Sequence, residues 1–166
     1  MKKRALLLAG GGARGAFQVG MLQELIINQG LDFQILRGVS VGSLNAAFLA
    51  QAPAVGDSKA ALVKKVQELR HVWVSEIKGN DSVYEERAGL PGLALGADSL
   101  YTLEPLKALI AKHISLDALM ASKRDFAVGV VSLKSGRYTE CTPEQFPHDF
   151  MERFLASSSI PVVFPL

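Results

Sequence analysis

The chain has 166 residues, which one hydrophobic core can organise, and its 49% of apolar residues favours strands covered on both faces. Eighteen basic and sixteen acidic residues give a formal charge of +2, which is too small to indicate a surface that binds nucleic acid. The single cysteine, Cys141, excludes an internal disulfide, and no cysteine or histidine pair has the spacing of zinc ligands. We therefore expect no metal, no cofactor and no nucleic-acid partner.

The amino terminus carries a short basic cluster and then an apolar block. The apolar run over residues 5–9 ends at Gly10, so it is shorter than the ~7–15 residues of a signal peptide core. Elsewhere no run approaches the ~20 apolar residues of a membrane-spanning helix. These features predict a cytoplasmic protein with at most peripheral membrane contact, and export without a cleavable signal remains compatible with them.

The first fifty residues alternate between strand and helix patterns. Residues 5–8 predict a buried strand, residues 14–28 an amphipathic helix ended by Gly30, residues 33–39 a second strand and residues 41–51 a second helix. The apolar positions of the first helix are Phe17, Val19, Leu22, Leu25 and Ile26. This alternation predicts an α/β fold with a parallel sheet, whose carboxyl edge carries both glycine-rich turns.

The remaining residues continue the same pattern with one interruption. Helices are predicted over residues 58–78, 103–113 and 149–156, and strands over residues 125–133 and 137–141, joined at Ser135-Gly136. The stretch 88–97 is apolar without any periodicity. It predicts either a lid that admits acyl chains or touches a bilayer, or an ordinary packed loop.

Residues 38–42 form a Gly-x-Ser-x-Gly pentapeptide, which we call the elbow. It lies where a predicted strand meets a predicted helix, the context that a nucleophile elbow requires. Gly38 and Gly42 leave room for the tight turn, and the hydroxyl of Ser40 is held at the amino end of a helix. Ser40 is thus a candidate nucleophile, the alternative being a serine that caps a helix by chance.

Gly10, Gly11 and Gly12, which we call the glycine run, follow the first strand and precede the first helix. Their backbone N-H groups are suited to bind an acyl oxyanion, which predicts an oxyanion hole. Arg14 either braces this loop and assists the charge, or is an ordinary surface residue.

The glycine run and Gly15 also match the dinucleotide pattern Gly-x-Gly-x-x-Gly. That alternative, an oxidoreductase fragment, requires an acidic residue at the end of the second strand to hold a ribose. Asp32 instead precedes that strand. Arg37 lies within it and would suit a phosphorylated ribose.

The two motifs together resemble the opening of the patatin-like phospholipase family, with its G-G-G-x-[RK]-G loop and later G-x-S-x-G. The resemblance continues through Leu44-Asn45-Ala46 and returns in the S-S-x-I-P-x-x-F-P segment within residues 156–165. It implies a three-layer α/β/α sandwich with a mainly parallel central sheet. It also implies lipid ester hydrolysis of the phospholipase A or lysophospholipase type. By the same resemblance, a Ser-Asp dyad would perform this chemistry, with Ser40 as nucleophile and Gly10, Gly11, Gly12 and Arg14 as oxyanion loop.

The chain departs from the family pattern at the second member of the dyad. The family's aspartate stands in an Asp-Gly-Gly or Asp-Gly-Ala triplet shortly after the segment that ends near Pro165, and no aspartate of this chain precedes a glycine. We therefore expect residues 1–166 to be a single patatin-like catalytic domain truncated before its aspartate. The alternative is a non-catalytic module that binds substrate without turning it over.

A histidine triad in the order serine, acid, histidine is a further alternative, with Asp125 and His148 as partners of Ser40. An ordinary α/β-hydrolase, however, places its elbow after several strands, whereas Ser40 follows only the second.

Overall fold

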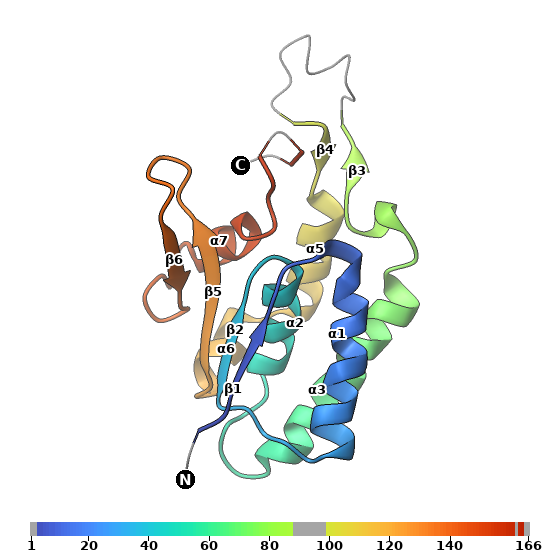
Figure 1. Cartoon of the computed structure of the whole chain (residues 1–166), viewed down its shortest axis with the longest axis vertical. Coiled ribbons are helices and arrows are strands. Elements are labelled where there is room, and N and C mark those ends of the chain that lie inside the picture. The colour runs from blue at the N-terminus through green and yellow to red at the C-terminus, as the bar shows by residue number, and fades with distance from the viewer. Residues whose placement is uncertain (1–2, 88–98, 162, 165–166) are drawn as a thin grey trace.

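A computed structural model describes residues 3–87, 99–161 and 163–164, and its centre is a four-stranded sheet (Figure 1). The strand order is β1-β2-β5-β6, in which β1, β2 and β5 run parallel and β6 is antiparallel to β5. The strands are β1 (Ala5–Leu8), β2 (Ile35–Gly38), β5 (Asp125–Val131) and β6 (Tyr138–Cys141). The predicted α/β class with a mainly parallel central sheet is confirmed.

The parallel strands are aligned so that their carboxyl ends meet at one edge of the sheet. Leu8 of β1 pairs with Gly38 of β2, and Gly38 pairs in turn with Val128 of β5. At this edge the chain leaves β1 for the glycine run and leaves β2 for Ser40. Parallel sheets bind their ligands at this edge, so the strand register alone brings the two motifs together.

Helices follow the strands largely where the periodicity predicts them, with π-helical turns extending two of them. They are η1 (Gly12–Arg14), α1 (Gly15–Leu22), η2 (Gln23–Asn28), α2 (Val41–Ala50), α3 (Ser58–His71), η3 (Val72–Glu76), η4 (Asn80–Ser82), α5 (Glu104–His113), α6 (Leu116–Ala121) and α7 (Phe150–Ala156). The sequence did not predict α6, nor the small antiparallel ladder of β3 (Glu85–Glu86) and β4 (Tyr101–Thr102). Within the described ranges, no helix is long and apolar enough to cross a bilayer.

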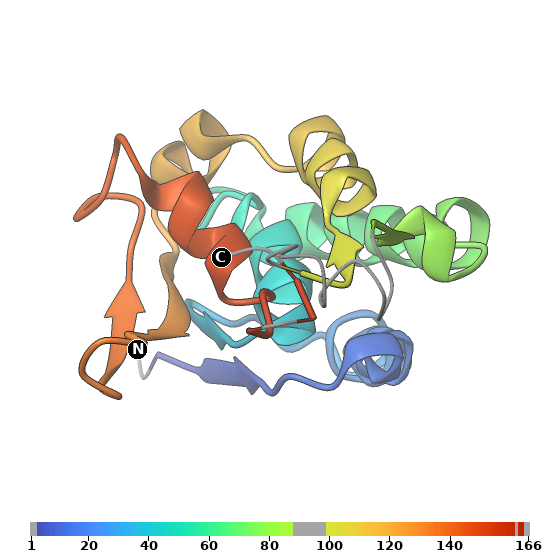
Figure 2. The same cartoon turned by 90° about the horizontal axis from the view of Figure 1, so that it is seen from above.

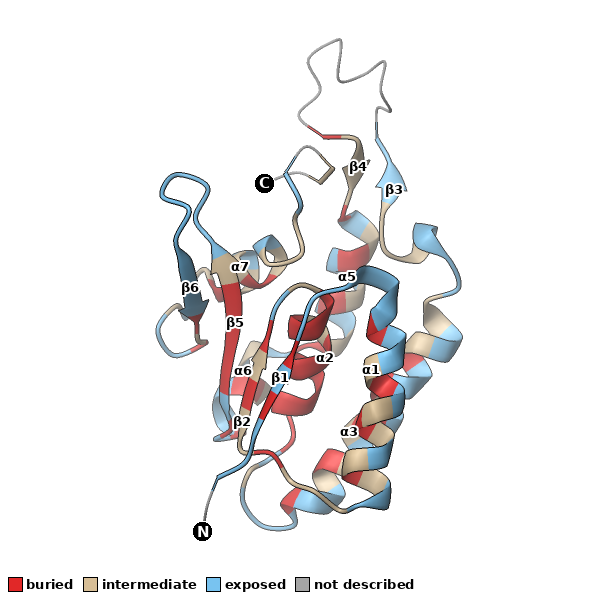
Figure 3. Cartoon of the chain, in the orientation of Figure 1, coloured by how far each residue is buried: buried red, intermediate tan, exposed pale blue. Residues whose placement is uncertain are grey.

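The core lies between one face of the sheet and the helices that pack on it. Leu6 and Leu8 of β1 are buried on this face, whereas Leu7 points to the opposite face and is 74% exposed. Helix α2 packs against β1, β2 and β5 and is buried along nearly its whole length. The view from above shows α2, α5, α6 and α7 on the same side of the sheet (Figure 2). The burial colouring places the buried positions between these layers (Figure 3).

Helix α1 buries a narrower stripe than its sequence predicts. Val19 and Leu22 are buried, but Phe17 is 80% exposed, so the prediction that Phe17 faces the core is wrong. Phe17 precedes Val19 by two positions, which is about 200° of helical rotation. The side chain therefore lies on the solvent face of α1.

A buried arginine ties the amino ends of the strands to the loop before α3. The side chain of Arg124 is fully buried and donates to the carboxylate of Asp32 (2.9 Å) and the hydroxyl of Ser58 (2.7 Å). It also donates to the carbonyl oxygens of Ala52 and Phe33. Burial alone would raise the pKa of Asp32, but hydrogen bonds from Arg124 and Ser58 outweigh it and hold that pKa below its usual value. This pairing makes a buried charge tolerable at the edge opposite Ser40.

Acid is expected to weaken the contact between η3 and α5. Glu76 accepts hydrogen bonds from Lys112 (2.8 Å) and His113 (3.0 Å), which hold the pKa of its carboxyl at about 2, against an ordinary 4.5. Because the folded pKa is depressed, this contribution to stability is complete above about pH 5 and is lost as the pH falls toward 2. Denaturant unfolding between about pH 7 and pH 3 measures the effect as a falling free energy of unfolding.

The glutamine variant isolates this contribution. Glu76→Gln should show a shallower loss of stability with acid than the wild type, because it has no carboxylate to protonate. Glu144→Gln is the matched control, since Glu144 is exposed and has no ion pair with a described residue. Equal pH dependence in Glu76→Gln and the wild type would contradict the prediction.

Candidate active site

Ser40 stands in the sharp turn between β2 and α2. Its φ of 53° and ψ of −131° lie outside the regions that non-glycine residues normally occupy, at a cost of roughly 1–3 kcal/mol. The first turn of α2 holds this geometry, since the amide of Ser43 donates to the carbonyl of Ser40 (2.8 Å) and that of Gly42 donates to Val39 (3.0 Å). The result is a half-buried serine at the amino end of a helix of ten residues.

No side chain fits at the two glycines of the elbow. A Cβ atom at Gly38 would lie 2.5 Å from the carbonyl oxygen of Gly42. A Cβ atom at Gly42 would overlap the carbonyl oxygen of Leu8 and lie 2.6 Å from that of Ala9. The elbow therefore packs backbone to backbone on the exit of β1, the strand that leads into the glycine run.

The glycine run passes directly beside Ser40. A Cβ atom at Gly10 would lie 3.2 Å from Cβ of Ser40 and 3.9 Å from its Oγ. Gly10, Gly11 and Gly12 are all exposed, and their amides donate no hydrogen bond to a residue that the structure describes. Free N-H groups of this kind bind anionic oxygens. Gly10, the first residue of the glycine run, thus lies beside the Ser40 hydroxyl.

Arg14 follows the glycine run at the end of η1. Its Cβ and Cδ atoms lie 3.4 and 3.8 Å from the position that a Cβ of Gly11 would take, so the side chain folds back over the loop. Arg14 is exposed and forms no ion pair within the described part of the chain. Its charge is therefore not neutralised by a carboxylate and lies near the loop.

A buried asparagine links α2 to the glycine run. Asn45 accepts a hydrogen bond from the indole of Trp73 (2.9 Å) and donates to the carbonyl of Gly15 (3.1 Å) and the amide oxygen of Gln18 (2.9 Å). Gln18 in turn donates to the carbonyl of Ala9 (2.7 Å). These four bonds fix the helix after Ser40 relative to both ends of the glycine run.

The Ser40 hydroxyl forms no hydrogen bond with a carboxylate or an imidazole among the described residues. Asp125 opens β5 and pairs with Ile35, which places it at the edge of the sheet opposite Ser40. Its carboxylate instead binds Arg37 at 2.8 Å. The structure therefore argues against a triad of Ser40, Asp125 and His148.

The charged residues weighed for a dinucleotide have other partners. Asp32 binds Arg124, and Arg37 binds both Asp125 and Glu140 (3.1 Å). Ser40, rather than an acidic residue, follows β2. The dinucleotide interpretation gains no support from this arrangement.

One further residue reaches the elbow from a distant part of the chain. The amide of Ser40 donates to Oγ of Ser157 (2.9 Å), across a sequence separation of 117 residues. Oγ of Ser157 donates to the carbonyl of Gly129 in β5 (2.7 Å). In the sequence, the S-S-x-I-P segment that contains Ser157 is the one signal for this contact.

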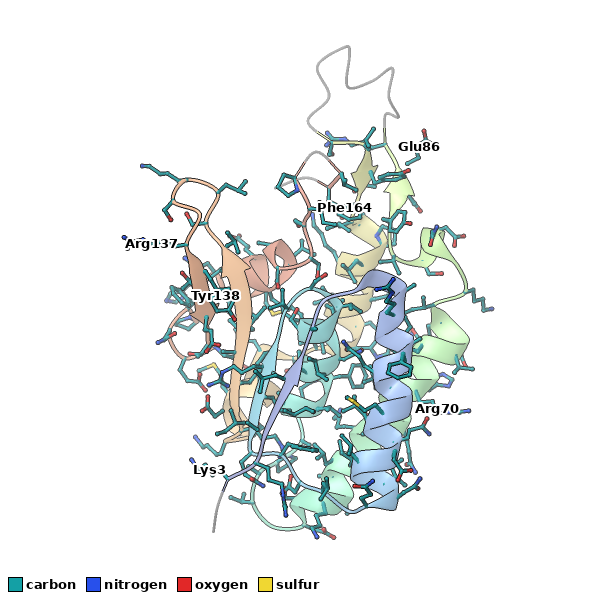
Figure 4. All side chains as sticks on the ribbon, in the orientation of Figure 1. Lys3, Arg70, Glu86, Arg137, Tyr138 and Phe164 are labelled. Atoms are coloured by element: carbon teal, nitrogen blue, oxygen red, sulfur yellow. The ribbon has the colours of Figure 1, made fainter. Side chains whose placement is uncertain are left out.

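The proposed lid over residues 88–97 lies outside the described residues. The strands that flank it in the sequence, β3 and β4, pair with each other, and Tyr101 of β4 belongs to an aromatic cluster with Tyr84 and Phe164. In this cluster Tyr84 lies 5.1 Å from Tyr101 and 5.5 Å from Phe164 between ring centroids. Figure 4 shows Phe164 beside this ladder. The β3–β4 ladder lies at the end of the molecule to which the carboxyl edge of the sheet points (Figure 1).

Two hollows lie between helices rather than at Ser40. One, of about 610 Å³, is lined by α3 and the end of α5, and includes Lys64, Lys65 and Lys112. The other, of about 60 Å³, is almost wholly apolar and lies between α2, α3 and α5. Neither Ser40 nor the glycine run lines them, so they do not account for substrate binding at the candidate site.

Comparison with known proteins identifies the family to which these motifs correspond. The family model described as patatin-like phospholipase matches residues 6–166. A search of curated proteins found no match. Among solved structures, the chain is similar to one in the heterodimeric ExoU-SpcU complex of the type III secretion system of Pseudomonas aeruginosa, at 17% identity and a TM-score of 0.47. That match covers 97% of this chain and 37% of the other, so this chain spans little more than a third of that protein's length.

Proposed function

The chain belongs to the patatin-like phospholipase family, and on that premise we propose that it is a serine hydrolase of lipid esters with Ser40 as its nucleophile. The observation that carries the proposal is the position of the Ser40 hydroxyl beside Gly10, where three backbone amides have no partner among the described residues. Acyl transfer requires a nucleophile and oxyanion donors at one place. The substrate class in this proposal is phospholipid or lysophospholipid.

The proposed reaction proceeds through an acyl-enzyme. Oγ of Ser40 forms a bond to the ester carbonyl carbon, and the carbonyl oxygen takes the negative charge while the amides of the glycine run donate to it. The amino end of α2 stabilises the same charge. The ester bond to the alcohol then breaks, and the alcohol leaves with the proton that Ser40 gave to the base. Water releases the fatty acid and restores the Ser40 proton.

The base in this proposal is an aspartate, as the family resemblance implies. No described carboxylate hydrogen-bonds to Ser40, and no aspartate of residues 1–166 has the required Asp-Gly context. We therefore place the base in a later part of the protein, and we take residues 1–166 as the amino-terminal part of one catalytic domain. Arg14 assists the oxyanion loop, since its charge is not paired with a described carboxylate.

In this proposal the protein contacts the membrane surface peripherally, and the lipid substrate reaches Ser40 from that surface. The ladder of β3 and β4 lies at the end of the molecule to which the carboxyl edge of the sheet points (Figure 1), and the apolar residues 88–97 come between these two strands in the sequence. An acyl chain would approach Ser40 from that end.

A comparison of two lengths of the protein tests the dyad. The 166-residue chain should release fatty acid from phosphatidylcholine vesicles about 10²- to 10⁴-fold more slowly than a form extended past Leu166 to include an Asp-Gly-Gly or Asp-Gly-Ala triplet, because general base catalysis contributes about this factor. Replacing that aspartate by asparagine in the extended form should abolish the gain. Equal rates for the two lengths would place the base within residues 1–166 and contradict the proposal.

A further inference from the structure

Ser157 is held on a rigid support next to the elbow. It ends α7, whose Phe150 and Phe154 are buried against the sheet, with Phe150 lying 6.1 Å from Phe126 of β5 between ring centroids. The amide of Ser157 donates to the carbonyl of Arg153 (3.1 Å), so its backbone continues the helical bonding. Its side chain therefore projects from a packed helix and not from a free loop.

The donor and acceptor in each of the two hydrogen bonds of Ser157 can be assigned in only one way. A hydroxyl carries one proton, and the carbonyl of Gly129 can only accept, so that proton points to Gly129. The oxygen of Ser157 is then left to accept from the amide of Ser40, which can only donate. The Ser157 hydroxyl thus bridges the elbow and β5 with both of its partners satisfied.

Ser40 needs such a partner because of its position in the fold. Ser40 has a φ of 53°, so it no longer follows the extended conformation of β2. It is also the residue that caps α2, and a helix provides no acceptor for the amide of its capping residue. An unpaired amide at this half-buried position would carry a desolvation cost. The bond from Ser157 removes that cost only while Ser40 keeps the strained conformation.

We propose that Ser157 is a positioning residue, which holds the backbone of Ser40 in the conformation that directs its hydroxyl toward the glycine run. This inference rests on the proposed function and extends it to a residue that lies outside the elbow and the glycine run. Ser157 acts through Ser40 and does not touch the substrate.

Three substitutions at Ser157 distinguish the effect of losing the hydrogen bond from the effect of changing the volume of the side chain. Ser157→Thr keeps the hydroxyl, Ser157→Val has nearly the shape of threonine without it, and Ser157→Ala removes it with less bulk. In the full-length protein, fluorophosphonate should label Ser40 about 10- to 100-fold more slowly in the valine and alanine variants, since a misplacement of about 1 Å can cost 10²-fold. The threonine variant should remain within about threefold of wild type.

A serine two positions away supplies the control. The hydroxyl of Ser159 donates to the carbonyl of Leu155 (3.2 Å) within the end of α7 and does not contact the elbow. Ser159→Ala should therefore label at the wild-type rate. Equal labelling of the valine and threonine variants at position 157 would overturn the inference.

Hydrogen exchange of the Ser40 amide provides a second readout that needs no reaction. Measured by NMR, this amide should lose protection in Ser157→Val and Ser157→Ala and keep it in Ser157→Thr, after correction for the global stability of each variant. Unchanged protection in all three would overturn the inference even if their labelling differed. A wild-type protein that the probe does not label at Ser40 would instead refute the proposed function, while the exchange data would still decide whether Ser157 holds the Ser40 amide.

Discussion

Ser40→Ala is expected to abolish covalent labelling by fluorophosphonate and to lower lipid ester hydrolysis by about 10⁴-fold or more, the order of loss that follows removal of a serine nucleophile. The reason is geometric: Ser40 Oγ lies beside Gly10 at the carboxyl edge of the sheet, and the variant leaves no hydroxyl at that point. The experiment uses the full-length protein. Peptide mapping of the labelled wild type should place the adduct on the peptide that contains Ser40.

A second serine distinguishes this effect from general reactivity. Ser135 lies in the exposed turn between β5 and β6, so Ser135→Ala should label and hydrolyse like the wild type. Labelling of Ser40→Ala at an undiminished rate would show that the nucleophile is another residue, and the assignment of Ser40 would then be wrong.

Among the glycines that the structure describes, Gly42 is the position where we expect a substitution by alanine to lower stability most. The new Cβ would overlap the carbonyl oxygen of Leu8 and lie 2.6 Å from that of Ala9, and backbone atoms cannot move aside as a flexible side chain can. Overpacking typically costs about 1–3 kcal/mol, and this backbone overlap should lie at the upper end of that range; relieving it would push the elbow away from the glycine run. Denaturant unfolding and the labelling rate at Ser40 measure the two consequences.

Another helical glycine is the matched control. Gly20 is exposed in α1, and a Cβ atom there would meet nothing within 4 Å. Gly20→Ala should therefore be neutral or more stable by up to about 1 kcal/mol, because alanine favours the helix over glycine. Equal effects of the two substitutions would contradict the close approach of the elbow to β1.

The strands and the two motifs could be predicted because their signals are local. A short apolar block that ends in glycines marks β1, and the Gly-x-Ser-x-Gly pattern marks the turn from β2 into α2. From the alternation of strand and helix, a parallel sheet follows, and with it the meeting of both turns at one edge. The meeting of Ser40 and Gly10 therefore follows from the sequence pattern.

Other features gave no local signal. Helix α6 has six residues, and the strands β3 and β4 have two each. Elements this short show no recognisable periodic pattern of apolar residues. Phe17 fits the apolar count of α1 but lies on its outer face. The bond from the Ser40 amide to Ser157 joins residues 117 positions apart, and no spacing rule reaches that far. Contacts of this kind depend on how α7 packs against β5, which is a property of the whole fold.

The central claim is that the Ser40 hydroxyl and the amides of the glycine run serve one carbonyl oxygen. A crystal structure of the fluorophosphonate adduct tests this most directly, because the phosphonyl oxygen takes the place of the oxyanion. We predict phosphorus bonded to Oγ of Ser40 and the phosphonyl oxygen about 2.7–3.1 Å from backbone nitrogens of Gly10, Gly11 or Gly12. An adduct on Ser40 whose phosphonyl oxygen points away from all three nitrogens would contradict the account.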